Sequence, residues 1–197
     1  MTVLLGVRTD QTVIIAGDNR GTNIKTNLSS DNLKKVHPIN NHLCIATAGN
    51  TAVGNAIMQD IEKLTDKQNI FIEDIIYVIK DFYSKVEERH STGIQLLTAS
   101  FLIGGLKRDG QTGLFTVHNC NGKLKIEDVP IMFTIIPPED VSMDMAGKIM
   151  MRNVNEQFED FIEKTVSEIS EFSMYVSKSG DKWIYGAVID KGRMESF

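Results

Sequence analysis

Strand-like and helix-like segments come in separate blocks along this 197-residue chain. Apolar alternation and turn residues predict two N-terminal hairpins, then two helices, four strands, two more helices and a final pair of strands. A tight turn joins only antiparallel neighbours, so strands that follow one another in hairpins form antiparallel sheets. The order therefore predicts an α+β fold, a four-layer αββα sandwich of two antiparallel sheets between helix layers.

The ranges of these segments follow from the spacing of apolar residues and turn signals. Strands are expected over 2–7, 12–16, 35–39, 42–47, 97–107, 113–117, 123–129, 131–136, 174–178 and 183–189, and helices over 50–67, 72–89, 140–154 and 156–170. Asp18 is expected to open a turn, residues 27–32 to form a loop, and Gly180-Asp181 to be the last turn. With no linker or repeat, residues 1–197 are expected to form a single domain.

Composition excludes several classes of function. The net charge is −5, and the longest basic runs, such as Lys34-Lys35, are pairs, which argues against nucleic-acid binding. No apolar run is long enough for a membrane span, and no leader precedes the first strand, so the expected location is cytoplasmic. Spacing does not pair Cys44 with Cys120, so both are expected to be reduced core residues.

No motif for a metal or cofactor is present. The four histidines, which are His37, His42, His90 and His118, form no zinc-binding pattern, and the first two are expected at the surface. The glycines from Gly49 to Gly54 have the spacing of a phosphate loop but lack its Lys-Ser/Thr. A methionine-rich stripe, which comprises Met143, Met145, Met150 and Met151, is typical of a core or a subunit contact. We therefore expect neither a metal nor a cofactor.

Thr2 is small enough for the initiator methionine to be removed in front of it. A terminal threonine joins a nucleophilic hydroxyl to its own amine, a base with an ordinary pKa of about 7.7–8.0. Such a site also needs a nearby cation and an N–H that binds the oxyanion. Taken alone, a threonine at this position usually has no catalytic role.

Three stretches set Thr2 in context: TVLLGVRTDQTVIIAGDNRGT, NLKKVHPI and CIATAGNTAVGNA. Together they resemble the N-terminal half of the proteasome β-subunit family, and most closely its bacterial HslV type. The resemblance is close over residues 2–55 and rests on element order beyond them. It implies an N-terminal nucleophile hydrolase fold, with Thr2 as nucleophile and base, and Asp18 as the acid that orients a lysine. That lysine is Lys35, with Lys34 as the register alternative, and Gly49 provides the oxyanion N–H.

The resemblance also implies a substrate pocket and shows where the chain departs from the family. Small or apolar residues would line the pocket and favour uncharged side chains of modest size; they are Gly21, Leu33, Thr47 and Thr51. The strand edge at Gly21 and Thr22 would pair with an extended peptide. The family's glycine-serine loop is replaced by FTIIPPEDVSM, in which Ser142 is the nearest hydroxyl, and Ser177 stands where proteasome subunits have an acid.

These residues predict a threonine-type N-terminal hydrolase that cleaves peptide bonds. Its expected substrate is a peptide or unfolded protein, and its expected form is a ring of identical subunits, with an ATP-dependent unfoldase as a candidate partner. Two alternatives remain open at this point. One is a non-catalytic scaffold or ring subunit of the same fold, and the other is an N-terminal hydrolase that acts as an amidase on a small substrate.

Overall fold

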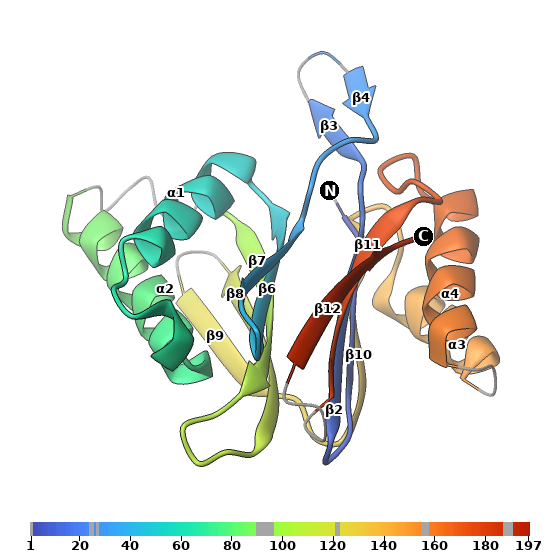
Figure 1. Cartoon of the computed structure of the whole chain (residues 1–197). Coiled ribbons are helices and arrows are strands. Elements are labelled where there is room, and N and C mark those ends of the chain that lie inside the picture. Colours follow the sequence, from blue (N-terminus) through green and yellow to red (C-terminus); the bar gives the residue numbers. More distant parts are fainter. Residues whose placement is uncertain are drawn as a thin grey trace.

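Two antiparallel five-stranded sheets form the body of the molecule in the computed structural model (Figure 1). The structure describes residues 2–23, 26, 28–89, 97–120, 123–154, 158–186 and 191–197. Within these residues there are also four α helices and a two-stranded hairpin. The predictions of an α+β chain, of two antiparallel sheets and of four helices are therefore confirmed.

The first sheet joins the two ends of the chain. Its strand order is β10-β1-β2-β11-β12, which correspond to Met132–Ile136, Leu4–Arg8, Thr12–Asp18, Gly180–Gly186 and Lys191–Ser196. β2 lies at the centre and pairs with β1 on one side and with β11 on the other. In the second pairing Asp18 lies opposite Gly180, so the end of β2 meets the beginning of β11.

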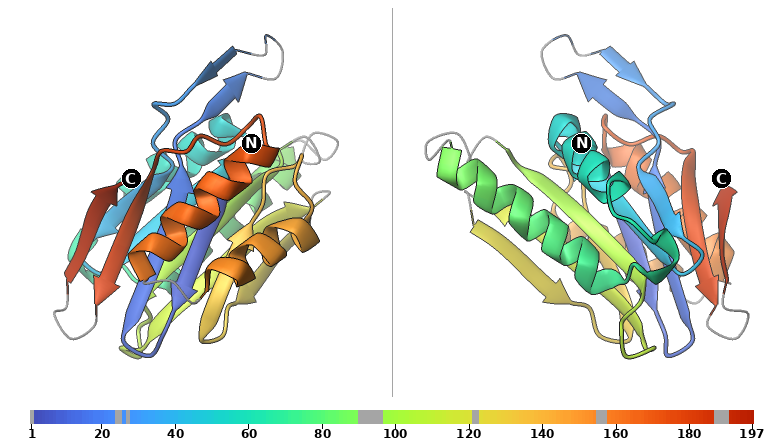
Figure 2. Two further views of the ribbon diagram at one scale, coloured as in Figure 1. Left: turned by 90° about the vertical axis from the view of Figure 1, so that its right-hand side faces the viewer. Right: turned by 60° about the vertical axis from the view of Figure 1, so that its left-hand side comes forward.

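The second sheet is a meander of consecutive strands. Its order is β5-β6-β7-β8-β9, which correspond to Val36–Asn40, Leu43–Gly49, Ala99–Leu106, Thr112–Cys120 and Lys123–Asp128. The helices are α1 (Thr51–Glu62), α2 (Ile72–Arg89), α3 (Met143–Asn153) and α4 (Phe158–Phe172), and a short 3₁₀ helix, η1, spans Lys67–Asn69. The hairpin of β3 (Gly21–Asn23) and β4 (Leu28–Ser30) projects from the body in every view (Figure 2).

Three buried apolar clusters hold these elements together. Alternate residues of β2 point to opposite faces, so Ile15 packs toward the second sheet while Ile14 packs against α3 and α4. In the same way Ile103 of β7 packs against α1 and α2, and Leu102 lies in the cluster between the sheets. Figure 1 shows α1 and α2 beside the second sheet, and α3 and α4 beside the first.

Several expected segments differ from the structure. Residues 28–30 form a strand rather than a loop, because they pair with β3. Asp18 ends a strand instead of opening a turn, and the helix expected to reach residue 67 ends at Glu62, ahead of η1. The expected strand over 174–178 is absent, and a strand over 191–196 was not predicted.

The turn expected at Gly180-Asp181 is also absent. Gly180-Asp181 has the composition of a turn, yet Gly180 opens β11 and pairs with β2. A Cβ atom at Gly180 would lie 2.4 Å from the carbonyl oxygen of Gly17, so the glycine permits close packing of backbone rather than a turn. His90 and the side chain of Cys120 lie outside the described residues, whereas Cys44 is buried and not disulfide-bonded.

A substitution at Gly104 tests how closely the two sheets pack. A Cβ atom there would lie 2.6 Å from Cγ1 of Val13, a β-branched side chain with little freedom to move. We expect Gly104→Ala to lower the free energy of unfolding by about 1–3 kcal/mol, measured by urea denaturation. The control is Gly147→Ala in α3, where nothing lies within 4 Å of the new atom, and it should raise stability by about 0.5–1 kcal/mol. Equal effects of the two substitutions would contradict close packing at Gly104.

Candidate active site

Asp18 is fully buried at the end of β2, and its carboxylate accepts four hydrogen bonds. Oδ1 accepts from Lys35 Nζ at 3.0 Å and from the backbone N–H of Val3 at 3.1 Å. Oδ2 accepts from the backbone N–H groups of Arg20 at 2.9 Å and Ser177 at 3.3 Å. Both oxygens are therefore held by donors from different parts of the chain, which fixes the orientation of the carboxylate.

Lys35 lies immediately before β5 with only 3% of its surface exposed. Its ammonium forms an ion pair with Asp18, whereas the neighbouring Lys34 is exposed. Burial lowers the pKa of Lys35, and the attraction of Asp18 offsets part of this shift. The structure thus pairs the predicted lysine, and not its register alternative, with the predicted acid.

Thr2 precedes β1 and is 5% exposed. It lines the same small hollow as Lys35 and Gly49, which we call the Thr2 hollow. The next residue, Val3, bonds to Asp18 twice: its N–H donates to the carboxylate, and its carbonyl accepts from the backbone N–H of Asp18 at 3.4 Å. The chain is therefore fixed directly beside Thr2. Met1 lies outside the described residues.

Gly49 ends β6 at the rim of the Thr2 hollow, just before α1. Its φ of +90° lies in the left-handed region, and a Cβ atom there would lie 2.9 Å from the carbonyl oxygen of Thr98. A glycine is therefore required at this bend. The following residue, Asn50, caps α1 by accepting from the N–H groups of Ala52 and Val53.

The Thr2 hollow has a volume of about 40 Å³. Of the four predicted pocket residues, Leu33, Thr47 and Thr51 line it. Gly21 does not, but it packs behind Leu33, whose Cδ2 would lie 3.0 Å from a Cβ atom at Gly21. Sequence reasoning missed six other lining residues, which are His37, Ala48, Asn50, Gly54, Asn55 and Met58.

The periodicity of two elements could have revealed four of these residues. Gly54, Asn55 and Met58 follow Thr51 at helical spacings of three, four and seven residues, so they lie along one face of α1. His37 stands two residues after Lys35 and extends the same face of the chain. The expectation that His37 lies at the surface is wrong, since it is partly buried, and burial together with the nearby Lys34 cation lowers its pKa. His42 is also partly buried, and its ring contacts the carbonyl oxygen of Ile70 at 3.1 Å.

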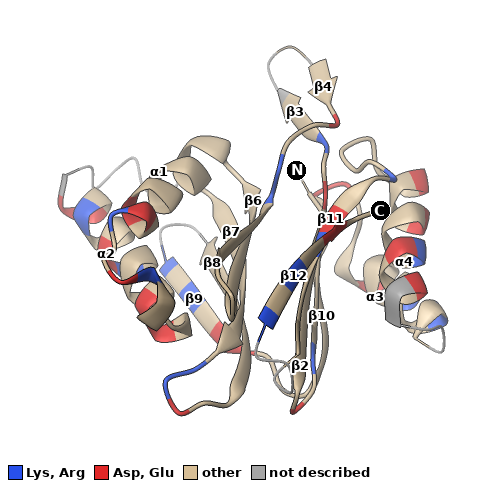
Figure 3. Ribbon diagram, in the orientation of Figure 1, with Lys and Arg blue, Asp and Glu red and all other residues tan. Residues whose placement is uncertain are grey.

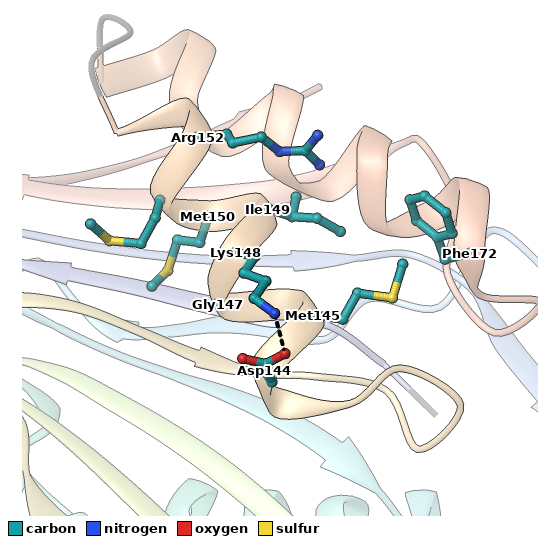
Figure 4. Close-up of a pocket in the computed structure, with 9 residues that line it drawn as sticks. Asp144, Met145, Gly147, Lys148, Ile149, Met150, Arg152 and Phe172 are labelled. Carbon is teal, nitrogen blue, oxygen red and sulfur yellow. Dashed lines mark hydrogen bonds and ion pairs between the residues drawn. The ribbon is translucent and has the colours of Figure 1, made fainter.

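A larger hollow of about 840 Å³ lies on the outer face of α3 and is lined by several methionines and Phe172 (Figure 4). Its charged lining residues include Asp144 and Lys148, which form an exposed ion pair one helical turn apart. It contains no serine, threonine, cysteine or histidine among its lining residues. Ser142, the nearest hydroxyl of the replaced loop, accepts from the Met145 N–H and caps α3. The larger hollow is therefore an apolar surface without a nucleophile.

Acidic and basic side chains are interspersed along α2 and α4 (Figure 3). Among the described residues, no group of three or more His, Cys, Asp or Glu side chains is placed to bind a metal ion. In the same part of the chain, no helix is long and apolar enough to span a membrane.

Family comparison is compatible with this fold. A sequence model of the family described as Proteasome subunit matches residues 2–125, which is more than half of the chain and includes every residue of the Thr2 hollow. The chain therefore belongs to the proteasome subunit family. Members of this family form oligomeric rings and are generally threonine peptidases. No curated protein sequence matches the chain.

The lowered pKa of Lys35 predicts how stability depends on pH. Between this lowered value and about 10.5, the unfolded chain binds the Lys35 proton more strongly than the folded chain does. The free energy of unfolding should therefore rise with pH through this window, by at most about 1.4 kcal/mol per pH unit. The rise is measured relative to the double variant Asp18→Asn/Lys35→Met, which lacks both charges. Urea denaturation between pH 8 and 10 measures the difference.

Tyr83→Phe is the control for this titration. Burial raises the pKa of Tyr83 to about 12, so its contribution has the opposite sign and is lost only as pH rises above about 10. Between pH 8 and 10, the free energy of unfolding of Tyr83→Phe should therefore change with pH as that of the unmodified chain does. If the difference in free energy of unfolding between the unmodified chain and the double variant did not change with pH, that result would contradict the lowered pKa of Lys35.

Proposed function

We propose that this chain is a threonine-type N-terminal hydrolase of the proteasome/HslV kind, acting on peptide bonds. We also propose that residues 1–197 form a single domain with the αββα layering of N-terminal nucleophile hydrolases. The observation that carries the proposal is the buried ion pair of Asp18 and Lys35 beside Thr2. Burying an ion pair carries a desolvation penalty, so the pair is weak evidence of a purely stabilising role. Its position beside a threonine hydroxyl instead supports a role in catalysis.

In the proposed reaction, removal of Met1 frees the α-amine of Thr2. That amine takes the proton from the Thr2 hydroxyl as Oγ attacks the substrate carbonyl carbon, and the N–H of Gly49 stabilises the oxyanion. The amine then passes the proton to the departing peptide amine, which leaves an ester on Thr2 Oγ that water hydrolyses. Lys35 disfavours protonation of the nearby amine, so the base stays free, and Asp18 holds the lysine in place.

The proposed substrate is a peptide or unfolded protein that extends along Gly21 and Thr22 and places one side chain in the Thr2 hollow. A volume of about 40 Å³ corresponds to roughly three water molecules. Together with Thr47 and Leu33 as lining residues, this size favours small uncharged side chains.

We also propose that the active form is a ring of identical subunits in the cytoplasm, with an ATP-dependent unfoldase as partner. Exposed apolar residues on and beside α3 and α4 support self-association; they are Met143, Met151, Phe172 and Met174. Met145 and Met150 instead pack against the core beneath α3.

Two other functions have some support. The placement of Ser142 as a helix cap, away from the Thr2 hollow, favours a non-catalytic ring subunit or scaffold. The small size of the Thr2 hollow favours an amidase that acts on a small molecule. Both would retain the family fold, and only the reaction at Thr2 separates them from the peptidase.

The state of Thr2 tests the proposed function. Intact mass of protein from its native host should show that Met1 is absent, and a peptide epoxyketone should then add to Thr2. Thr2→Ala should abolish labelling and peptide hydrolysis, because it removes the nucleophile, while Thr2→Ser should keep both. Peptide mapping by mass spectrometry locates the label.

Thr26→Ala is the matched control, since Thr26 is exposed and does not line the Thr2 hollow, so this variant should still be labelled at Thr2. Retention of Met1 in the native host would contradict the catalytic proposal and favour the scaffold. A free Thr2 that cleaves small amides but resists the peptide probe would favour the amidase.

The size of the Thr2 hollow predicts a preference for small side chains. Peptides with alanine before the cleaved bond should have a kcat/KM at least about tenfold higher than peptides with phenylalanine there. Gly54→Ala places a methyl group 3.5 Å from Thr47 Oγ1, an ordinary contact distance, so it should narrow the hollow without unfolding α1. This variant should increase the preference further, whereas Gly147→Ala in α3 should leave it unchanged. Equal cleavage of both peptides would refute the size argument.

A further inference from the structure

The segment between α4 and β11 is held by side chains rather than by a strand partner. Ser173 Oγ donates to Asp140 Oδ1 at 2.7 Å, and the Met174 N–H donates to Asp140 Oδ2 at 3.0 Å. Arg20 Nη1 donates to the Met174 carbonyl at 3.3 Å, while the same guanidinium forms a bidentate pair with Asp31. One end of the segment is therefore anchored beside the chain that follows Asp18.

Ser177 anchors the other end directly at the buried carboxylate. It is 3% exposed, and its backbone N–H donates to Asp18 Oδ2. Its hydroxyl accepts from the Asn19 N–H at 3.2 Å and donates to the Ser179 carbonyl at 2.8 Å. The serine hydroxyl thus bridges the residue after Asp18 and the residue before β11.

This bridge fixes the distance between the Ser177 N–H and the Asp18 carboxylate. Without the hydroxyl, the N–H of Asn19 keeps only its bond to the Ser179 carbonyl at 3.1 Å, and nothing in the Ser177 side chain ties the segment to β2. A carboxylate that loses a firmly placed donor on Oδ2 can rotate away from Lys35 on Oδ1. The effect would then pass from Ser177 through Asp18 to the ammonium of Lys35.

We propose that Ser177 is a positioning residue, whose hydroxyl holds the 173–179 segment so that Asp18 keeps Lys35 aimed at Thr2. Its catalytic consequence rests on the proposed function, but its effect on the Asp18–Lys35 pair does not. A serine that only closed a turn before β11 would contribute to stability and leave the properties of Lys35 unchanged.

The first test compares Ser177→Ala with Ser177→Thr. Alanine keeps the backbone N–H but loses both hydroxyl bonds, so we expect kcat for peptide hydrolysis to fall about tenfold with little change in KM. Threonine retains a hydroxyl and should restore most of kcat. Ser170→Ala is the control, because Ser170 Oγ donates to the Ser167 carbonyl at 2.6 Å, a bond within α4. Activities are compared per mole of folded protein.

The second readout is an NMR titration of the Lys35 side chain, assigned with Lys35→Met. Of the charged groups that act on Lys35, Asp18 and Asp31 raise its pKa and Arg20 lowers it. If Asp18 is released in Ser177→Ala, the pKa of Lys35 should fall below that of the unmodified chain, and Ser177→Thr should reverse the fall. An unchanged Lys35 titration in folded Ser177→Ala would overturn the proposal, whatever happens to activity.

The two proposals can fail separately. If the unmodified chain hydrolyses no peptide while the Lys35 titration responds to Ser177→Ala, the proposed function fails and the positioning role stands. If Ser177→Ala does not fold, Asp140→Asn loosens the same segment from its other end, because it removes one carboxylate oxygen that accepts from Ser173 or Met174. It should shift the Lys35 titration in the same direction, and no shift would again overturn the proposal.

Discussion

The buried ion pair of Asp18 and Lys35 is the interaction on which the rest of the structure depends. Burying both charges carries a desolvation penalty of several kcal/mol per ion, which only good geometry and further hydrogen bonds offset. Asp18 receives its four donors from the residue before β1, from the residues after β2, from the residue before β5 and from the 173–179 segment. Removing one partner of such a pair typically destabilises a protein by about 3–5 kcal/mol. The pair therefore joins both sheets and both halves of the chain at one point.

Glycines allow the backbone to approach this point closely. Gly17 and Gly180 lie side by side where β2 meets β11, next to Asp18, and a Cβ atom at Gly180 would overlap the Gly17 carbonyl. Gly49 bends the chain from β6 into α1 with a positive φ. The polar site is thus built at strand ends, where the ladders stop and backbone donors become available to side chains.

Local patterns in the sequence predicted much of this fold. Helix α1 begins at Thr51, one residue after the predicted start, because helix periodicity and capping depend on residues a few positions apart. Errors arose where distant contacts decide the conformation. The 174–178 segment resembles a strand, but its polar groups bond to Asp140 and Asp18 instead. No local signal shows that Ser177 meets a residue 159 positions earlier.

The candidate site was predictable to a similar extent. Taken alone, Asp18 has the sequence context of a turn residue and Lys35 that of a surface residue. Only the family resemblance predicted that they act together, and the structure shows their ion pair. Strand and helix periodicity could have predicted His37 and the α1 residues of the Thr2 hollow. Periodicity could not have predicted the proposed role of the Ser177 hydroxyl, because that role depends on where Asp18 is buried.

Under the proposed mechanism, one electrostatic field would serve both the base and the transition state. α1 begins two residues after Gly49 and has no acidic residue in its first turn, so the positive end of its dipole is not neutralised there. The Lys35 ammonium adds a second positive centre at the Thr2 hollow. Together they would raise the free energy of a protonated Thr2 amine and lower that of an oxyanion at Gly49. The same field would repel cationic substrate side chains, so catalysis and selectivity for uncharged residues follow from one arrangement of charge.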